Sequence, residues 1–291
     1  MPFRFKKKES VAKAVRRLCC ERLDDALETL DKGARLTAVH HVRKEIKKLR
    51  SILRLIRQEI GKNKYGEHTQ ALRRAANLLT HFRDAQVKLN AFDGLVQHFK
   101  RKLPTRPFPE IKMAWQKNCR AEERKLAQAI VPLKGILVTS RERFDDLKIE
   151  AKGWKAIAPG LKKVYGRGRD FFETTRQRPV PENFHEWRKR VKNLWHQLRL
   201  LCPVQPRSLR KRIDHLEKLG NLLGDDHDLF MLNEFVASEC GNVQAFEDLI
   251  LSRQEKLRST ALKIGGRFYR EKPGRFCRRI EDYWKSWRRE G

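Results

Sequence analysis

The chain matches itself when one copy is shifted by 145 positions. Val39 to Leu49 (VHHVRKEIKKL) recurs in outline as Phe184 to Leu194 (FHEWRKRVKNL). A shorter match lies upstream at a shift of 146, and another lies downstream at 144, where Asn77 corresponds to Asn221. Chance similarity between Lys- and Leu-rich helices is the alternative, but three collinear matches at a nearly constant shift indicate duplication of a whole module.

The spacing of apolar residues is helical along almost the entire chain, and no run shows the sustained alternation of a strand. Clusters of Pro and Gly separate the segments at 61–66, 104–109, 179–181 and 203–206. The expected helices span residues 10–31, 36–60, 67–81, 84–102, 109–131, 155–176, 182–202, 207–223, 226–239, 242–270 and 275–289. The sequence therefore predicts an all-α fold of two pseudo-symmetric antiparallel helical bundles that arise from the internal duplication.

The repeat also predicts where the chain divides. Its junction should fall between residues 140 and 154. This gives a first helical-bundle repeat over residues 1–147 and a second over residues 148–291. Each half has the size of a four-helix bundle.

The formal net charge is +31 over 291 residues, with 67 Lys and Arg against 36 Asp and Glu. A field of this size attracts polyanions, so nucleic acid, an anionic membrane surface and polyphosphate are all admissible partners. Hydrophobic residues make up 40% of the chain, which is enough for a sizeable core and excludes wholesale disorder.

The six cysteines are scattered without a C-x-x-C pair, which argues against a zinc module or a disulfide framework and fits a reducing compartment. The first ten residues are charged and no apolar run follows them, so no secretory signal is expected. The most apolar stretch, Leu126 to Val138, is interrupted by Pro132 and Lys134 and should not span a membrane. We therefore expect a cytoplasmic protein with no membrane insertion.

On a helical wheel each copy of the repeated segment separates into a charged and an apolar side. The first basic stripe consists of His40, Arg43, Lys44, Lys47 and Arg54, with Lys48 and Arg50 near its rims. The second basic stripe consists of His185, Arg188, Lys189, Lys192, His196 and Arg199. The apolar sides carry Val42, Ile46, Leu49 and Leu53 in the first copy, and Trp187, Val191, Leu194 and Leu198 in the second.

A charged helix face is ordinarily just solvated. These stripes, however, carry no acid on the wheel, and like charges at i,i+4 spacing repel unless an anion neutralises them. The first stripe is roughly 20 Å long at a rise of about 1.5 Å per residue, which suits a linear polyanion. His40 and His185 recur at the same place in both copies. Either could cap or pack its helix, or donate to a phosphate oxygen.

These residues resemble the CHAD family, the conserved histidine α-helical domain. The family's first repeat has a His, an Arg three positions on and then a basic cluster, and its second has a His, an Arg and a Lys. The matching residues are His40, Arg43, Lys47, Lys48 and Arg50 in the first copy, and His185, Arg188 and Lys192 in the second. Later elements also match: Arg83-Asp84, Leu223-Gly224, His227-Asp228, Gly266 to Tyr269 and Glu271 to Pro273.

The resemblance implies that the two halves form one CHAD domain with a basic groove or channel that binds inorganic polyphosphate, with association with polyphosphate granules. We expect no cofactor and no metal, and the oligomeric state is left open. The chain departs from the family pattern where Trp195 stands in place of a base and where Asn193 replaces another. The second half is therefore expected to bind less strongly than the first.

Two other functions compete with this one. Non-specific nucleic-acid binding fits the charge, but no helix-turn-helix, zinc-finger or RNA-recognition motif is present, and aromatic residues do not interleave with the basic stripes. A metal-dependent phosphohydrolase is suggested by His40, His41, His81 and the run Asp225 to Asp228. Against it, the first copy has Arg83-Asp84 where the second has His227-Asp228, so Asp84 and Asp228 are expected to pair with cations or to cap helices. We expect no enzyme activity.

Overall fold

The computed structural model describes residues 3–33, 36–80, 82, 93, 108–239 and 244–289. Every regular element in these ranges is an α-helix or a short 3-10 helix, which confirms the all-α prediction. The elements are α1 (Val11–Asp31), α2 (Leu36–Leu55), α3 (Gly61–Leu78), α5 (Phe108–Asp145), η1 (Gly153–Ala156), α6 (Ala158–Gln177), α7 (Pro181–Leu201), η2 (Cys202–Val204), α8 (Pro206–Glu239), α9 (Gln244–Phe268) and α10 (Pro273–Arg289). The helix expected at 84–102 lies outside the described residues, apart from position 93.

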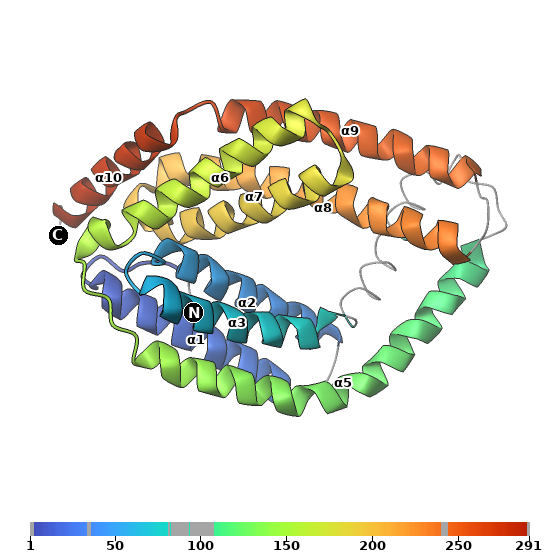
Figure 1. The fold of residues 1–291 in the computed structure, drawn as a ribbon, viewed down its shortest axis with the longest axis horizontal. Coiled ribbons are helices and arrows are strands. Elements are labelled where there is room, and N and C mark those ends of the chain that lie inside the picture. The colour runs from blue at the N-terminus through green and yellow to red at the C-terminus, as the bar shows by residue number, and fades with distance from the viewer. Residues whose placement is uncertain are drawn as a thin grey trace.

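The helices form two layers (Figure 1). Helices α1, α2, α3 and α5 pack on one another, and so do α6, α7, α8 and α9, while α2 lies against both α6 and α7 and joins the layers. The chain leaves helical structure after Asp145 and re-enters it at Gly153, inside the interval where the repeat placed its junction. The duplication and the boundary at residue 147 stay predictions.

The apolar sides expected on the repeated segments are the sides that the fold buries. Val42, Ile46, Leu49 and Leu53 on α2 are at most 1% exposed. Trp187, Val191, Leu194 and Leu198 on α7 are all completely buried. Burying one such side chain stabilises the fold by about 1.5–3 kcal/mol, so these rows fix the rotation of both helices and turn their basic stripes outward.

Three expected breaks between helices are wrong. Helix α3 begins at Gly61 and includes Gly66, because the preceding break falls at residues 56–60. Helix α5 continues through the exposed Pro132 to Asp145, because Leu133 and Phe144 beyond the proline are buried in the core, and their burial outweighs the cost of the proline. Helix α8 is continuous where a break was expected at residues 223–226.

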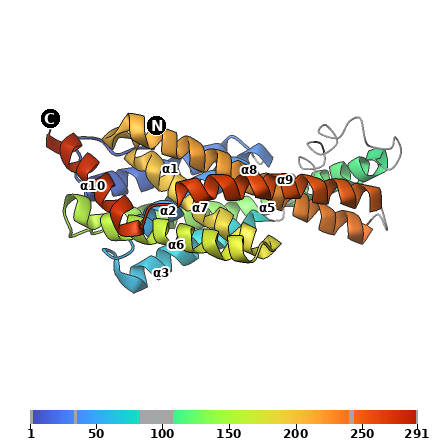
Figure 2. The ribbon, with the colours of Figure 1, turned by 90° about the horizontal axis from the view of Figure 1, so that it is seen from above.

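The two ends of the chain meet at the second layer. The Phe5 amide donates to the Leu200 carbonyl over 3.1 Å, and the Phe5 ring meets the edge of Trp284 with centroids 5.6 Å apart. Arg288 on α10 donates to the carbonyl oxygen of Glu9 over 2.7 Å. Figure 2 shows α10 projecting from the end of the molecule opposite the far end of α9. Within the described ranges, no helix is long and apolar enough to cross a membrane.

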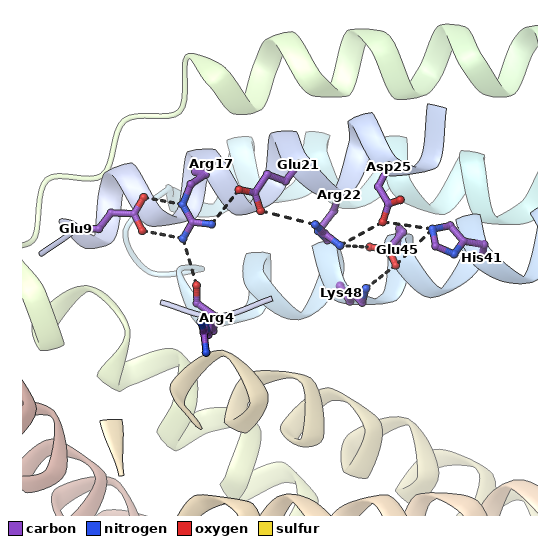
Figure 3. A network of polar contacts seen from close by, with 9 residues as sticks. All are labelled: Arg4, Glu9, Arg17, Glu21, Arg22, Asp25, His41, Glu45 and Lys48. Atoms are coloured by element: carbon purple, nitrogen blue, oxygen red, sulfur yellow. Dashed lines mark hydrogen bonds and ion pairs between the residues drawn. The ribbon is translucent and has the colours of Figure 1, made fainter. Parts of the chain in front are cut away.

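A chain of ion pairs runs through the first layer (Figure 3). Arg17 donates to both oxygens of Glu9 over 2.7 and 2.8 Å and to Glu21 over 3.1 Å. Further along α1, Arg22 approaches Glu45 of α2 over 3.4 Å, and Lys48 donates to the other oxygen of Glu45 over 2.5 Å. Lys48 is therefore a buried, paired cation, and its expected place at the rim of the first basic stripe is wrong.

Glu45 neutralises two cations in the interior, so its loss should be costly. We predict that Glu45→Gln lowers the free energy of unfolding by about 3–5 kcal/mol, because the buried Lys48 would lose its carboxylate and Arg22 would keep Asp25 and Glu21 but lose Glu45. Equilibrium urea unfolding measures the change. The exposed Glu28 on α1 supplies the matched control, since Glu28→Gln should change stability by less than about 0.5 kcal/mol. Equal effects of the two substitutions would contradict the role of Glu45.

Candidate anion-binding site

The first basic stripe lies on α2 as predicted. His40, Lys44 and Lys47 are exposed, while Arg43, Arg50 and Arg54 are half-buried. Arg43 donates from one Nη to the Ala76 carbonyl over 2.8 Å and to the Thr80 hydroxyl over 3.4 Å, both at the end of α3. These two bonds fix the direction of the guanidinium group.

Arg50 and Arg54 occupy the inner end of this stripe, where cations crowd. Burial, followed by the charge of Arg73, lowers the pKa of Arg50. Burial, followed by the charge of Arg50, lowers the pKa of Arg54 to about 10. Both guanidinium groups stay protonated at neutral pH because even the lowered value is far above 7. The fold thus holds poorly solvated cations close together, which an incoming anion would relieve.

A basic hollow opens where α2, α6 and α7 meet. It is lined by Arg54, Arg57, Tyr65, Lys163, Val164, Arg167, Arg190 and Asn193, and none of these residues is acidic. Its cavity volume is about 30 Å³, which is the share of one water molecule, so a phosphate group would reach these cations from the mouth. Sequence reasoning missed four of its cations, Arg57, Lys163, Arg167 and Arg190. The i,i+4 spacing of Lys163 and Arg167 was the one signal available.

The second basic stripe lies on α7, and two of its side chains, Arg188 and Lys192, pack against α8. Lys192 donates to the side chain of Asn221 over 3.1 Å. A Cβ atom added to Gly220 would meet the Lys192 side chain at 2.8 Å, and one added to Gly224 would lie 3.4 Å from the Arg188 guanidinium. The two glycines therefore leave the space through which these cations run. This packing also explains why Gly224 does not interrupt α8.

The two stripes make comparable contacts. Arg43 lies against position 76 of α3 and position 80 just beyond that helix, and Arg188 lies against Gly224 of α8. The sequence shift relates Arg43 to Arg188 and position 80 to position 224, so the contacts correspond under the predicted duplication.

The histidines that open the two stripes differ. His185 stacks on His227 of α8 with ring centroids 4.4 Å apart. Burial, followed by the charge of His227, lowers the pKa of His185 to about 4, so this imidazole is neutral at pH 7. His40 is exposed on α2. His185 can therefore offer a phosphate a hydrogen bond but no charge.

Two expectations about the second stripe are wrong. An acid does accompany it, since Lys189 donates to Glu186 over 2.5 Å one turn earlier on α7. An aromatic ring also interleaves with it, since Lys192 lies 5.4 Å and Arg199 lies 4.6 Å from the centroid of Trp195.

His196 is not part of the basic surface as the wheel predicted, because it is only 4% exposed. Its ring lies between Phe3 and Trp195, with centroids 6.3 and 4.8 Å away. Burial lowers the pKa of His196 well below its usual value, and nearby cations lower it further: Arg199, Lys48, Lys47 and Lys192. Cations of α2 and α7 therefore gather around one buried imidazole, and the two basic stripes meet there.

Buried hydrogen bonds hold this junction together. The Ser51 hydroxyl of α2 donates to the Asn193 carbonyl over 3.1 Å, and the Gln197 amide of α7 donates to the Ser51 carbonyl over 3.2 Å. These bonds fix the register of α2 against α7, and that register determines which cations of the two helices lie close together. The acceptor at position 193 is a main-chain carbonyl, so this contact does not depend on the asparagine side chain.

Within the described ranges, one cluster of carboxylates and a histidine has the spacing of metal ligands, but basic side chains already occupy its carboxylates. The ligand atoms of Asp25, His41 and Glu45 lie within 4.8 Å of one another, but Arg22 and Lys48 already bind these carboxylates. In the run that suggested a phosphohydrolase, Asp226 pairs with Arg258 over 2.6 Å. Asp228 lies inside the continuous helix α8 beside His227, so its expected capping role is wrong. His81 and Arg83-Asp84 lie outside the described residues.

The fold and the site define an all-α protein whose paired bundles concentrate cations along two facing helices. The family model of the CHAD domain matches residues 14–237, and the chain belongs to the CHAD domain family. Among solved structures, it is similar to the CHAD domain from the plant Ricinus communis, with a TM-score of 0.68 and 16% sequence identity over 90% of this chain and 95% of that one. At this identity the likeness shows the fold alone. No curated protein matches the sequence.

The burial of His196 predicts a pH dependence of stability. The unfolded chain binds a proton at this histidine near pH 6.5, whereas the folded chain does not, so the contribution is present above pH 6.5 and is lost as the pH falls below it. We expect His196→Gln to reduce the loss of unfolding free energy between pH 6.5 and 5 by about 1 kcal/mol per pH unit. Urea unfolding across this range measures it. In this variant the unfolding free energy should still fall somewhat as the pH falls, because the pKa of His185 is also lowered in the folded protein. An unchanged slope would contradict the burial of a neutral ring.

Proposed function

We propose that this CHAD protein binds inorganic polyphosphate along the basic stripes of α2 and α7, with the hollow between α2, α6 and α7 as part of the same surface. One observation carries the proposal: the fold brings cations of both helices around His196 and around a hollow with no acidic lining. The basic residues of the two stripes follow the lengths of α2 and α7, and this linear arrangement suits a linear polymer of phosphates. The proposal extends to residence on polyphosphate granules in the cytoplasm.

Nucleic acid is the main alternative partner. Proteins that bind single-stranded nucleic acid without sequence preference use exposed aromatic rings on which the bases stack. Trp195 is the aromatic residue on the stripes, and Lys192 and Arg199 already lie over it. The cations that surround the site need only phosphate oxygens, so a polymer without bases satisfies them fully.

The binding test replaces cations of the two stripes together. We expect the variant Lys47→Gln, Arg50→Gln, Lys192→Gln and Arg199→Gln to bind long-chain polyphosphate on the order of 100-fold more weakly, since four phosphate contacts of about 0.7 kcal/mol each would be lost. Calorimetric titration at several salt concentrations measures both the affinity and its salt slope, which should become shallower by about 0.7 per lost phosphate contact.

A charge-matched variant separates the site from net charge. Lys32, Lys152, Lys155 and Lys272 are exposed and lie in turns or short segments outside α2 and α7. Replacing these four with Gln removes the same charge and should change the affinity only slightly. If both variants weaken binding equally, the stripes are merely solvated faces. Tighter binding of single-stranded DNA than of polyphosphate at equal salt would favour the alternative partner.

The second test concerns catalysis, which we propose the protein does not perform. Dense cations clamp the ground state and the transition state alike, and uniform binding does not accelerate the chemical step. We expect no release of orthophosphate from polyphosphate above a protein-free control when Mg²⁺ or Mn²⁺ is present. Release that requires the metal and that disappears in His227→Ala with Asp228→Ala would establish a hydrolase instead.

A further inference from the structure

A second concentration of cations lies where α8 begins and α9 ends. The two helices pack side by side (Figure 2), and a surface cavity of about 810 Å³ opens there. The lining residues are Arg207, Ser208, Lys211, Arg212, His215, Arg267 and Phe268. No acid is among them. We call this cavity the α8–α9 pocket.

The pocket is built from a regular row on one helix and a single arginine from the other. Arg207, Lys211 and His215 follow one another at i,i+4 spacing on α8, about 6 Å apart along the axis, and all three are exposed. Arg267 is exposed at the end of α9. Arg207 and Ser208 belong to the first turn of α8, whose amide groups add partial positive charge at the same end.

Arg212 forms the fixed part of the pocket. Its guanidinium lies 5.7 Å from the centroid of Phe276 and 6.0 Å from that of Phe268. The nearest carboxylate is Glu271, which lies 3.7 Å from Arg212 but is bound more closely by Arg279 over 2.6 Å. Burial, followed by the charge of Arg279, lowers the pKa of Arg212. One shared carboxylate therefore serves two arginines, and the pocket keeps an excess of positive charge.

The pocket is separate from the two basic stripes. Lys211 precedes Gly220 by nine residues, which at 100° per residue places it about half a turn around α8 and about 13 Å along it. Gly220 is the position on which Lys192 of the second basic stripe rests. The pocket and the stripe thus occupy opposite sides of α8, and one short phosphate chain cannot contact both.

We propose that the α8–α9 pocket is a second oligophosphate site, which makes the protein bivalent and able to bridge two segments of polyphosphate. The inference rests on the proposed function for the identity of the polymer, but it concerns different residues. The aromatic residue of the pocket, Phe268, is only 6% exposed and faces Arg212, so it provides no platform for a nucleic-acid base. Phe268 therefore adds no stacking contact to the charges of the pocket, which suits an anion without bases.

Stoichiometry tests the proposal. Inorganic tripolyphosphate, which is too short to span the two sites, is titrated calorimetrically into four proteins at low salt: the unchanged protein, the four-residue stripe variant, the charge-matched control, and a pocket variant with Arg207→Gln, Lys211→Gln and Arg267→Gln. The pocket variant leaves Arg212 and its contact with Glu271 in place, and its three changed residues are exposed, so folding should be preserved. We expect two sites in the unchanged protein and in the control, and one in each of the other two.

Bridging gives an independent readout. With long-chain polyphosphate, light scattering should show large particles for the unchanged protein and the control, and a loss of most of that signal for the pocket variant although its affinity for the polymer persists. A pocket variant that keeps two tripolyphosphate sites and full scattering would overturn the second site and leave the proposed function standing. Loss of the pocket site alone, in a protein whose stripe variant binds normally, would sustain the second site and refute the stripes. A pocket that takes up single-stranded DNA but no tripolyphosphate would also overturn the inference.

Discussion

The structure depends on one interaction, which is the repulsion between cations that the buried core holds close together. The apolar rows of α2 and α7 must face inward, so their basic stripes have no freedom to rotate away from each other. Two like charges about 4 Å apart repel by about 1 kcal/mol in water and by about 4 kcal/mol near a protein surface. Burial first, and then the charge of a neighbouring arginine, lowers the pKa values of Arg50, Arg54 and Lys192.

The protein treats its interior and its surface cations differently. Among the described residues, the buried Arg22 and Lys48 share the carboxylate of Glu45, and the half-buried Arg258 pairs with the buried Asp226. On the stripes, several cations rest on neutral groups: Arg43 on a carbonyl and a hydroxyl, and Arg199 on an indole ring. Such contacts fix the direction of the side chains. Under the proposed function, an anion completes this arrangement, and its repeated phosphates would match a repeated pattern of cations.

Neighbouring residues show how far sequence reasoning reaches. Lys47 and Lys48 look alike in the sequence, yet the first is exposed and the second is buried beside Glu45, because one residue turns the helix by 100° and the core lies on that side. The wheel identified the first basic stripe correctly except for Lys48 at its rim. It placed His196 on the surface, because no local pattern reveals that Phe3, almost two hundred positions away, covers that ring. The sequence also predicts helix breaks at Pro132 and Gly224 that the structure does not have. Helices distant in the sequence pack against α5 and α8 at these positions and keep both helices continuous.

The sequence by itself determined the helical class, the apolar and basic sides of α2 and α7, and the membership of the CHAD family, because periodicity and motif order are local properties of the chain. The tertiary structure alone decided which cations share a site. Arg57 of the first half meets Lys163, Arg167 and Arg190 of the second only after α2 has docked on α6 and α7. Arg207 and Arg267 likewise meet only because α8 packs beside α9. Electrostatic interactions depend on distance in space, and the separation of two residues along the chain does not set that distance until the core has packed.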